Sequence, residues 1–222
     1  MCEVGAAISF ALPNVVARKE LFEAHAVAQL VHSHFQDRRL QFTELCAGCG
    51  LLAIFLVLLD SCRFVDCVDK KESRVTPRLL NILAETWPAV QSQISWEYSD
   101  IRFDFMPRAD SVVVACHACG LLSDDVILAA TAGNVKRPMV LVPCCYSLRP
   151  SIVKAQLWRP GQSWSAWPWL QGGNVNKRGP EAVHEARVQH LQHLGYEVFV
   201  EQIDATITPY NTAIVAHPGT CT

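Results

Sequence analysis

The sequence predicts an α/β fold built on an open, doubly wound and mostly parallel sheet that ends in an antiparallel hairpin. The first observation is the segment from Gln41 to Asp69, which reads as a short strand, a glycine turn, an apolar helix and a second strand. The second is the pair of apolar runs at 197–203 and 211–217, which only residues 204–210 separate. So short a link permits an antiparallel hairpin and excludes a helical crossover.

The remaining elements are expected in chain order. Residues 18–35 carry apolar side chains at helical spacing and should form an N-terminal helix before the first strand. Further strands are expected at 94–99, 111–116 and 139–142, and a helix should open at Leu121. At 222 residues the chain has the size of one domain. We therefore expect a single domain over 1–222, with a basic, tryptophan-rich insertion at about 149–179.

The turn after the first strand is expected to bind a nucleoside-bearing cofactor. Gly48 and Gly50 lie at this join, where residues without a Cβ reach unusual dihedral angles and let a ligand approach the backbone. Asp69 ends the second strand, where an open α/β sheet places a carboxylate against a ribose. With Ala53 the glycines match the dinucleotide fingerprint G-x-G-x-x-G/A. This motif alone leaves open a dinucleotide, another nucleoside cofactor or an ordinary strand-to-helix turn.

From Glu44, the same segment is E-x-C-x-G-x-G, which resembles the first motif of the seven-stranded S-adenosylmethionine-dependent methyltransferases, with Cys46 in place of the first glycine. Three later motifs add to the resemblance: HACG-x-x-x-D at 117–124, PCCY at 143–146 and ITPYN at 207–211. Together they are similar to one branch of this family, which includes bacterial methyltransferase-domain proteins and tRNA 2′-O-methyltransferases of the Trm13 type. The resemblance covers roughly residues 19–218.

The resemblance implies a Rossmann-like sheet with strand order 3-2-1-4-5-7-6 and binding of S-adenosylmethionine. Asp69 would accept from the ribose and Asp100 from the adenine amino group. The full set of expected cofactor-binding residues is Lys19, Glu44, Cys46, Gly48, Gly50, Asp69, Lys70, Asp100, Ile101 and His117. The expected catalytic or acceptor-orienting residues follow strands four and five and are His117, Cys119, Cys144, Cys145 and Tyr146. Asp124, one turn into the next helix, is expected to cap that helix or to favour its dipole.

The region from Val126 to Pro180 is basic and rich in tryptophan. It has no Asp or Glu, seven Lys or Arg residues and four of the six tryptophans. Cations interleaved with exposed aromatic rings suit phosphate contact and base stacking, which favours RNA as the acceptor. The expected substrate contacts are Lys154, Arg159, Trp164, Trp167, Lys177 and Arg178, with Tyr210 and Asn211 at the rim that the resemblance marks. A tryptophan lid over the pocket and a docking surface for a partner protein are the competing interpretations.

The ten cysteines are expected to be reduced, because an α/β chain of this size without a signal sequence has little need of disulfides. Two C-x-x-C pairs, at 46–49 and 116–119, have the spacing of zinc ligands, but packing is the favoured interpretation and no metal is expected. No uninterrupted apolar stretch reaches membrane-spanning length. We expect an intracellular protein, cytoplasmic or alternatively mitochondrial, that does not contact a membrane.

Three functions remain compatible with the sequence. The first is an active S-adenosylmethionine-dependent methyltransferase that modifies RNA, either tRNA or rRNA. The second is a methyltransferase fold kept as a non-catalytic factor in RNA or ribonucleoprotein assembly. The third is an NAD-dependent oxidoreductase. The intact Gly48, Gly50, Asp69 and Asp100 favour retained cofactor binding.

Overall fold

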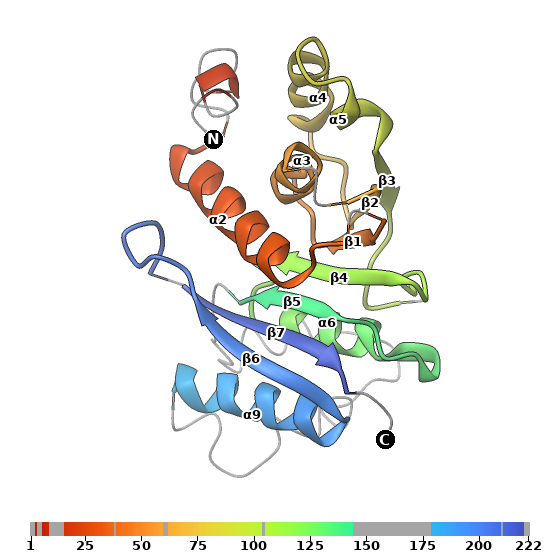
Figure 1. Cartoon of the computed structure of the whole chain (residues 1–222), viewed down its shortest axis with the longest axis vertical. Helices are drawn as coiled ribbons and strands as arrows, with labels where there is room; N and C mark the ends of the chain where they lie inside the picture. Colours follow the sequence, from red (N-terminus) through yellow and green to blue (C-terminus); the bar gives the residue numbers. More distant parts are fainter. Residues whose placement is uncertain are drawn as a thin grey trace.

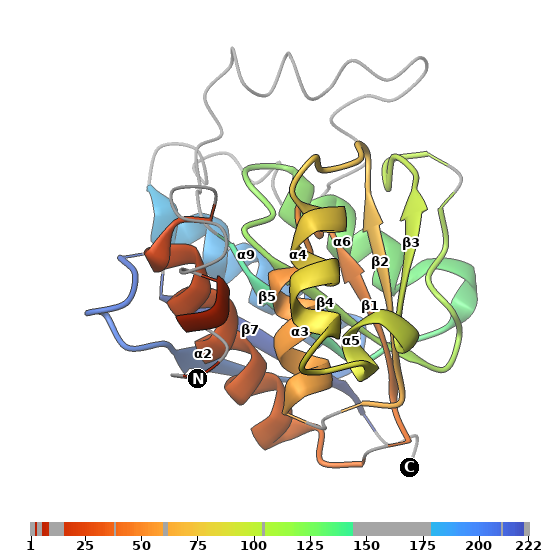
Figure 2. The same ribbon diagram turned by 90° about the horizontal axis from the view of Figure 1, so that it is seen from above.

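The computed structural model is an α/β sandwich in which one sheet carries helices on both faces (Figures 1 and 2). It describes residues 3, 6–8, 16–37, 39–59, 62–103, 105–143, 179–209 and 211–219. The strands are β1 (Gln41–Leu45), β2 (Phe64–Asp69), β3 (Ile94–Tyr98), β4 (Ser111–Cys116), β5 (Met139–Val142), β6 (Tyr196–Gln202) and β7 (Thr212–Pro218). The helices are α2 (Arg18–His34), α3 (Leu51–Leu58), α4 (Thr76–Ala84), α5 (Ala89–Ser92), α6 (Leu122–Ala130) and α9 (Pro180–His193), with a 3-10 turn at Ala132–Asn134.

The seven strands lie in the order β3-β2-β1-β4-β5-β7-β6. β1 to β5 pair in parallel, whereas β7 pairs antiparallel with both β5 and β6. The α/β class, the strand order and the terminal hairpin that the sequence predicts are therefore confirmed. Because the parallel strands all point the same way, the loops after β1, β2, β3 and β4 meet at one edge of the sheet, where ligands bind in open α/β folds.

Alternate residues of each central strand face two separate hydrophobic cores. On β4, Val112 and Val114 pack in the core with α2, α3 and α4, whereas Val113 and Ala115 pack in the core with α6 and α9. Figure 1 shows these two groups of helices on opposite faces of the sheet. Since both faces are covered, β4 and β5 are apolar without the alternation of polar residues that marks a half-exposed strand.

The two helices nearest the expected site form for different reasons. α3 is the run LLAIFLVL, and because seven of its eight residues are buried it lies as a core helix against the sheet. α2 buries an apolar stripe that includes Leu21, Val27 and Val31. Its polar residues, such as Glu20 and Gln29, are exposed to solvent. The stripe also buries one charged residue, Glu23, whose partners belong to the site described below.

Two fully buried arginines correct expectations drawn from the sequence. Arg137 belongs to the basic window, but its guanidinium donates to the carbonyls of Arg108, Ala130 and Ala132, so it is not a surface charge. Asp124 was expected to cap α6 or to interact favourably with its dipole. It lies in the first turn of the helix, where no side chain caps the N-terminus, and its carboxylate also pairs with Arg187 of α9, at 2.6 Å between Oδ2 and Nη2. Arg187 comes from an element 63 positions away, so the local pattern could not reveal this partner.

Sequence patterning did not anticipate α4 and α5, which connect β2 to β3. Pro77 lies in the first turn of α4, where proline costs no helical hydrogen bond. Elsewhere the boundaries of the expected strands shift by one residue, as for β7, which begins at Thr212. Among the described residues, no helix is long and apolar enough to cross a membrane.

Candidate cofactor and active site

The turn between β1 and α3 uses left-handed backbone conformations at three nearby positions. Cys46, Gly48 and Gly50 have φ values of 60°, 58° and 78°. A Cβ at Gly48 would meet no atom within 4 Å, so glycine is favoured there by the positive φ angle and not by lack of space. At Gly50 a Cβ would lie 2.6 Å from the ring of Trp96 on β3, so glycine is required by both conformation and space. The turn is thus packed directly against the ring.

Glu44, the acid that opens the glycine motif, is buried beneath this turn. Its Oε2 accepts a hydrogen bond from the backbone N–H of Ala53 in α3, at 2.9 Å, and lies 3.7 Å from the thiol of Cys67. Burial disfavours the charged form and raises the pKa of Glu44 to about 8, although the bond from Ala53 acts in the opposite direction. Glu44 therefore fixes the turn to the helix rather than presenting its carboxyl group to solvent.

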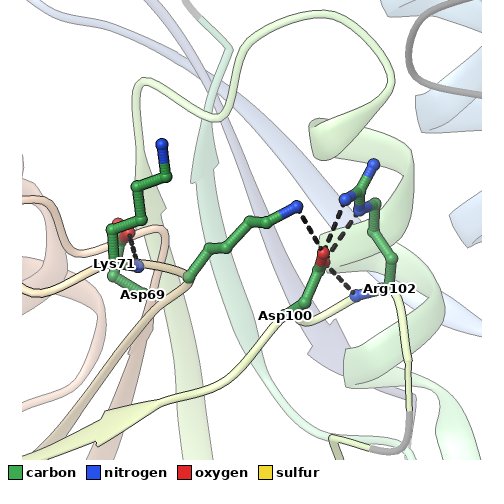
Figure 3. Close-up of polar contacts among 5 residues, drawn as sticks. Asp69, Lys71, Asp100 and Arg102 are labelled. Carbon is green, nitrogen blue, oxygen red and sulfur yellow. Dashed lines mark hydrogen bonds and ion pairs between the residues drawn. The ribbon is translucent and has the colours of Figure 1, made fainter.

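Asp69 ends β2 beside the glycine turn. Its Oδ2 accepts from the backbone N–H of Gly48 at 2.9 Å. Its Oδ1 accepts from the backbone N–H of Lys71 at 3.1 Å, as Figure 3 shows. Both contacts come from the backbone and hold the carboxylate at the carboxyl edge of the sheet. Each oxygen keeps a further lone pair, so the group can still accept from two adjacent hydroxyls of a ribose.

Asp100 follows β3 and lies between two cations. Arg102 donates to it through Nε at 2.8 Å and Nη2 at 2.5 Å, and Nζ of Lys70 lies 3.1 Å from Oδ2 (Figure 3). The hydrogen bonds from Arg102, with that from Lys70, hold the pKa of the Asp100 carboxyl well below its usual range. Asp100 is therefore ionised and fixed in place, and Arg102 is a site residue that no motif in the sequence indicated.

These residues surround a cavity of about 260 Å³ at the carboxyl edge of the sheet. Its lining comes from the loops after β1, β2 and β3 and from the start of α6, and consists of Cys46, Asp69, Lys70, Ser99, Asp100, Ile101, Arg102 and Leu122. The structure thus brings together five of the ten residues that the sequence predicts to contact the cofactor: Cys46, Asp69, Lys70, Asp100 and Ile101. Gly48 and Gly50 shape the adjoining turn, and Glu44 lies under it.

A second polar group joins α2 to the end of β4. Nε2 of His117 lies 3.1 Å from Oε2 of Glu23, and Nζ of Lys19 lies 3.2 Å from Oε1 of the same carboxylate. His117 has φ +64°, a conformation that few residues other than glycine adopt. Of this group, Lys19 and His117 were expected at the site. The spacing of Lys19 and Glu23 in the sequence allows a helical ion pair, which the structure contains, but contact of Glu23 with His117 was not expected.

Five of the described cysteines are free thiols that are buried or half-buried. Burial raises the pKa of Cys46 to about 12 and that of Cys49 to about 11, and it also raises the pKa values of Cys67 and Cys116 well above the ordinary value. These four are therefore protonated and poor nucleophiles at neutral pH. Within the described ranges, no cluster of three His, Cys, Asp or Glu side chains is arranged to hold a metal ion.

Cys119 differs from the expectation of reduced cysteines, because it is disulfide-bonded in the structure. Sequence spacing cannot reveal which thiols a fold brings together. Its role as a catalytic residue stays a prediction, as do those of Cys144, Cys145 and Tyr146, which lie outside the described residues.

The expected substrate contacts lie almost entirely outside the described part of the chain. These are Lys154, Arg159, Trp164, Trp167, Lys177, Arg178 and Tyr210. The exception is Asn211. Its side-chain Nδ2 donates to the backbone carbonyl of Ile203 at 3.1 Å, and its backbone carbonyl accepts from the backbone N–H of Ile203. Asn211 therefore closes the turn between β6 and β7.

Comparisons with solved structures place this fold among methyltransferases. A proposed S-adenosyl-L-methionine-dependent methyltransferase of Methanococcus maripaludis is 14% identical with a TM-score of 0.51, over 100% of this chain and 93% of that one. The methyltransferase domain of bacterial CtHen1-C is 14% identical with a TM-score of 0.56, over 91% and 100%. Magnesium protoporphyrin IX methyltransferase of Synechocystis PCC 6803, solved with bound S-adenosylmethionine, is 12% identical with a TM-score of 0.52, over 89% and 78%.

At these identities the likeness concerns the fold alone. A comparison with curated protein sequences finds no match. The family comparison is decisive, because residues 20–149, more than half of the chain, match the family described as Methyltransferase domain. That range includes the glycine turn, Asp69, Asp100 and the Glu23–His117 contact. The chain belongs to this family of methyltransferase domains.

Proposed function

We propose that this methyltransferase transfers the methyl group of S-adenosylmethionine to RNA. Use of S-adenosylmethionine follows from the family and the fold. The RNA acceptor is supported by the composition of the window from Val126 to Pro180. The observation that carries the proposal is the pair Asp69 and Asp100, two fixed carboxylates that line one cavity at the switch point of the sheet.

The residues present fit an S-adenosylmethionine molecule. Asp69 can accept from the ribose hydroxyls, and Asp100 with Ile101 can hold the adenine, since a carboxylate can accept from an amino group and an apolar side chain can cover a ring. The glycine turn lets the backbone approach the ligand at Gly48, where a Cβ would meet no protein atom. The sulfonium supplies an already activated methyl carbon, so the protein mainly has to align the acceptor and exclude water.

The RNA acceptor is supported by charge and aromatic content. The basic window contains no acidic residue, and with Arg137 buried six Lys or Arg residues remain in it. A chain whose net charge is −2 thereby concentrates positive charge in one stretch of sequence. Phosphate neutralisation by such a stretch gives sequence-independent attraction, and tryptophan side chains add base stacking. An RNA acceptor also suits the cytoplasmic or mitochondrial location that the sequence predicts.

A labelling experiment tests the acceptor. Purified protein would be incubated with radiolabelled S-adenosylmethionine and with RNA and protein extracted from cells that lack the gene, because their methylation sites are empty. We expect label that ribonuclease removes and protease does not. Label confined to the protein fraction would contradict the RNA acceptor and leave the methyltransferase assignment intact.

Salt dependence tests the basic window directly. Lys177→Gln with Arg178→Gln should reduce the slope of log RNA affinity against log salt by roughly 1.5 to 2 units, because each phosphate contact releases counterions. Arg63→Gln with Arg78→Gln, two exposed arginines of the described region, is the matched control and should leave the slope unchanged. Equal slopes in both double variants would remove the window as the RNA contact. Cofactor affinity should be unchanged in all of these proteins.

A further inference from the structure

Glu23 is a buried carboxylate whose partners are two residues of the expected site. Its side chain is 3% exposed and lies on the apolar face of α2, beside the core formed with α3. A charge buried in such a place is costly unless it is paired. The pairs are His117 at 3.1 Å and Lys19 at 3.2 Å, one to each carboxylate oxygen. Packing alone would favour an apolar residue at this position, so the carboxylate needs another explanation.

His117 is fixed from two directions. Its backbone N–H donates to the carbonyl of Val142, which ties the residue to the end of β5 at 3.0 Å. Its left-handed φ of +64° is an unfavourable conformation for a residue with a Cβ, and such residues gather at functional sites where the surroundings enforce them. The ring is then held by Glu23 from α2. The backbone is thus positioned by the sheet and the imidazole by a helix.

We infer that Glu23 is a positioning residue for methyl transfer, which orients the imidazole of His117 and stabilises the charge that this ring gains. A carboxylate bonded to one ring nitrogen selects the tautomer with the proton on that nitrogen and fixes the orientation of the ring. This inference rests on the proposed methyltransferase function. It extends that function by requiring an acceptor that carries an O–H or N–H proton, because only such an acceptor needs a base.

The step balances in atoms and charge. The bond between sulfur and the methyl carbon breaks, and its electron pair goes to sulfur to give S-adenosylhomocysteine. A new bond forms between the acceptor atom and the methyl carbon, and the acceptor proton passes to the imidazole of His117. The imidazolium then lies next to the carboxylate of Glu23 until the proton leaves to water.

Lys19 completes the arrangement from the preceding turn of α2. Its ammonium, on a side chain that is 51% exposed, faces the Glu23 oxygen that His117 does not contact. A cation at that distance offsets part of the cost of burying the carboxylate. Lys19→Met should therefore weaken the effect of Glu23 without abolishing it, since the bond to His117 remains.

Kinetics on the full chain test the coupling. The variants are Glu23→Leu, Glu23→Gln, His117→Ala and Glu23→Leu with His117→Ala, and Glu20→Gln, an exposed acid on the same helix, is the control. We expect kcat to fall about 100- to 10,000-fold in His117→Ala and about 10- to 100-fold in Glu23→Leu. The double variant should be no slower than His117→Ala, and Glu23→Leu should leave KM for S-adenosylmethionine unchanged. Losses that multiply in the double variant would overturn the inference.

Nuclear magnetic resonance gives a readout that needs no acceptor. The ring nitrogen signals of His117 can be identified by their absence in His117→Ala. In Glu23→Leu these signals should move, because the partner of Nε2 is lost, whereas Glu20→Gln should leave them in place. Unchanged signals in Glu23→Leu would overturn the inference even if no acceptor had been found. If Glu23→Leu does not fold, Glu23→Gln is measured instead. It keeps an oxygen acceptor and removes the charge beside Nε2, so the His117 signals should move because of the lost charge, and unchanged signals would again overturn the inference.

The two proposals can fail separately. If label from S-adenosylmethionine enters protein rather than RNA, the RNA acceptor is wrong and the kinetic cycle is measured on the labelled protein fraction. If RNA is labelled equally well by wild type and Glu23→Leu, the acceptor stands and the role of Glu23 is wrong.

Discussion

The carboxylate of Asp69 and the backbone N–H of Gly48 are joined by a hydrogen bond of 2.9 Å that links the end of β2 to the turn after β1. The same carboxylate accepts from the N–H of Lys71 on its other oxygen. Asp69 therefore has two functions: it fixes the glycine turn from one side and lines the cavity on the other.

Asp69→Ala should weaken binding of S-adenosylhomocysteine by roughly 2 to 4 kcal/mol, about 30-fold or more, because charge-assisted bonds to the ribose are lost together with the brace on Gly48. Asp69→Asn keeps one acceptor oxygen and should lose less binding affinity than Asp69→Ala. Isothermal titration calorimetry measures both. An affinity in Asp69→Ala equal to that of the wild type would remove Asp69 from the cofactor site.

Gly50 offers a test of the packed turn. Gly50→Ala should lower the free energy of unfolding by about 2 to 4 kcal/mol, because the new Cβ meets Trp96 at 2.6 Å and the backbone has φ +78°. Gly48→Ala meets no atom and should cost only about 1 to 2 kcal/mol for its conformation. Urea denaturation compares the two. In Gly50→Ala with Trp96→Phe the loss should be smaller than the sum of the single losses, and strict additivity would mean that the ring is not the obstacle.

The buried pair of Asp124 and Arg187 anchors the loop that carries His117. Arg187 bonds both Asp124 and the carbonyl of Gly120, three residues after His117. Arg187→Met leaves a buried carboxylate without this partner and should lower the free energy of unfolding by about 3 to 5 kcal/mol. Arg187→Met with Asp124→Leu removes both charges and should restore much of that loss. A double variant as unstable as the sum of both single variants would contradict this account.

The fold was predictable because its signals are local. The segment 41–69, with its glycine turn, predicts one strand-helix-strand unit, and the short link at 204–210 permits only a hairpin. The strand order followed from the resemblance and is confirmed. The helices α4 and α5 were not anticipated, because the stretch between β2 and β3 has no long apolar periodicity and its helices are short.

The site was predictable in part for the same reason. Asp69 and Asp100 are found at strand ends, and a strand end can be located from its own sequence. The roles of Glu23, Arg102 and Arg187 were missed because each depends on a contact that only the folded structure shows. Glu23 reads as half of a helical ion pair with Lys19, and only the packing of α2 against the end of β4 brings His117 to its second oxygen.

Glu44 predicts how stability depends on pH. Its pKa is raised to about 8 in the folded protein, above its ordinary value of 4.5, so folding favours the protonated form. The resulting contribution to stability is complete below about pH 4.5 and is lost as the pH rises through 8. Within that range the loss approaches about 1.4 kcal/mol per pH unit.

Glu44→Gln isolates this contribution, because the amide oxygen can still accept from the N–H of Ala53 and the side chain no longer ionises. The difference in unfolding free energy between wild type and Glu44→Gln should therefore shift in favour of the variant as the pH rises from 5 to 8, since groups that titrate in both proteins cancel. Urea denaturation at several pH values, without cofactor, measures it. Profiles that stay parallel over this range would mean that Glu44 is ionised in the folded protein, and the carboxylate would then need a cationic partner at the base of the glycine turn.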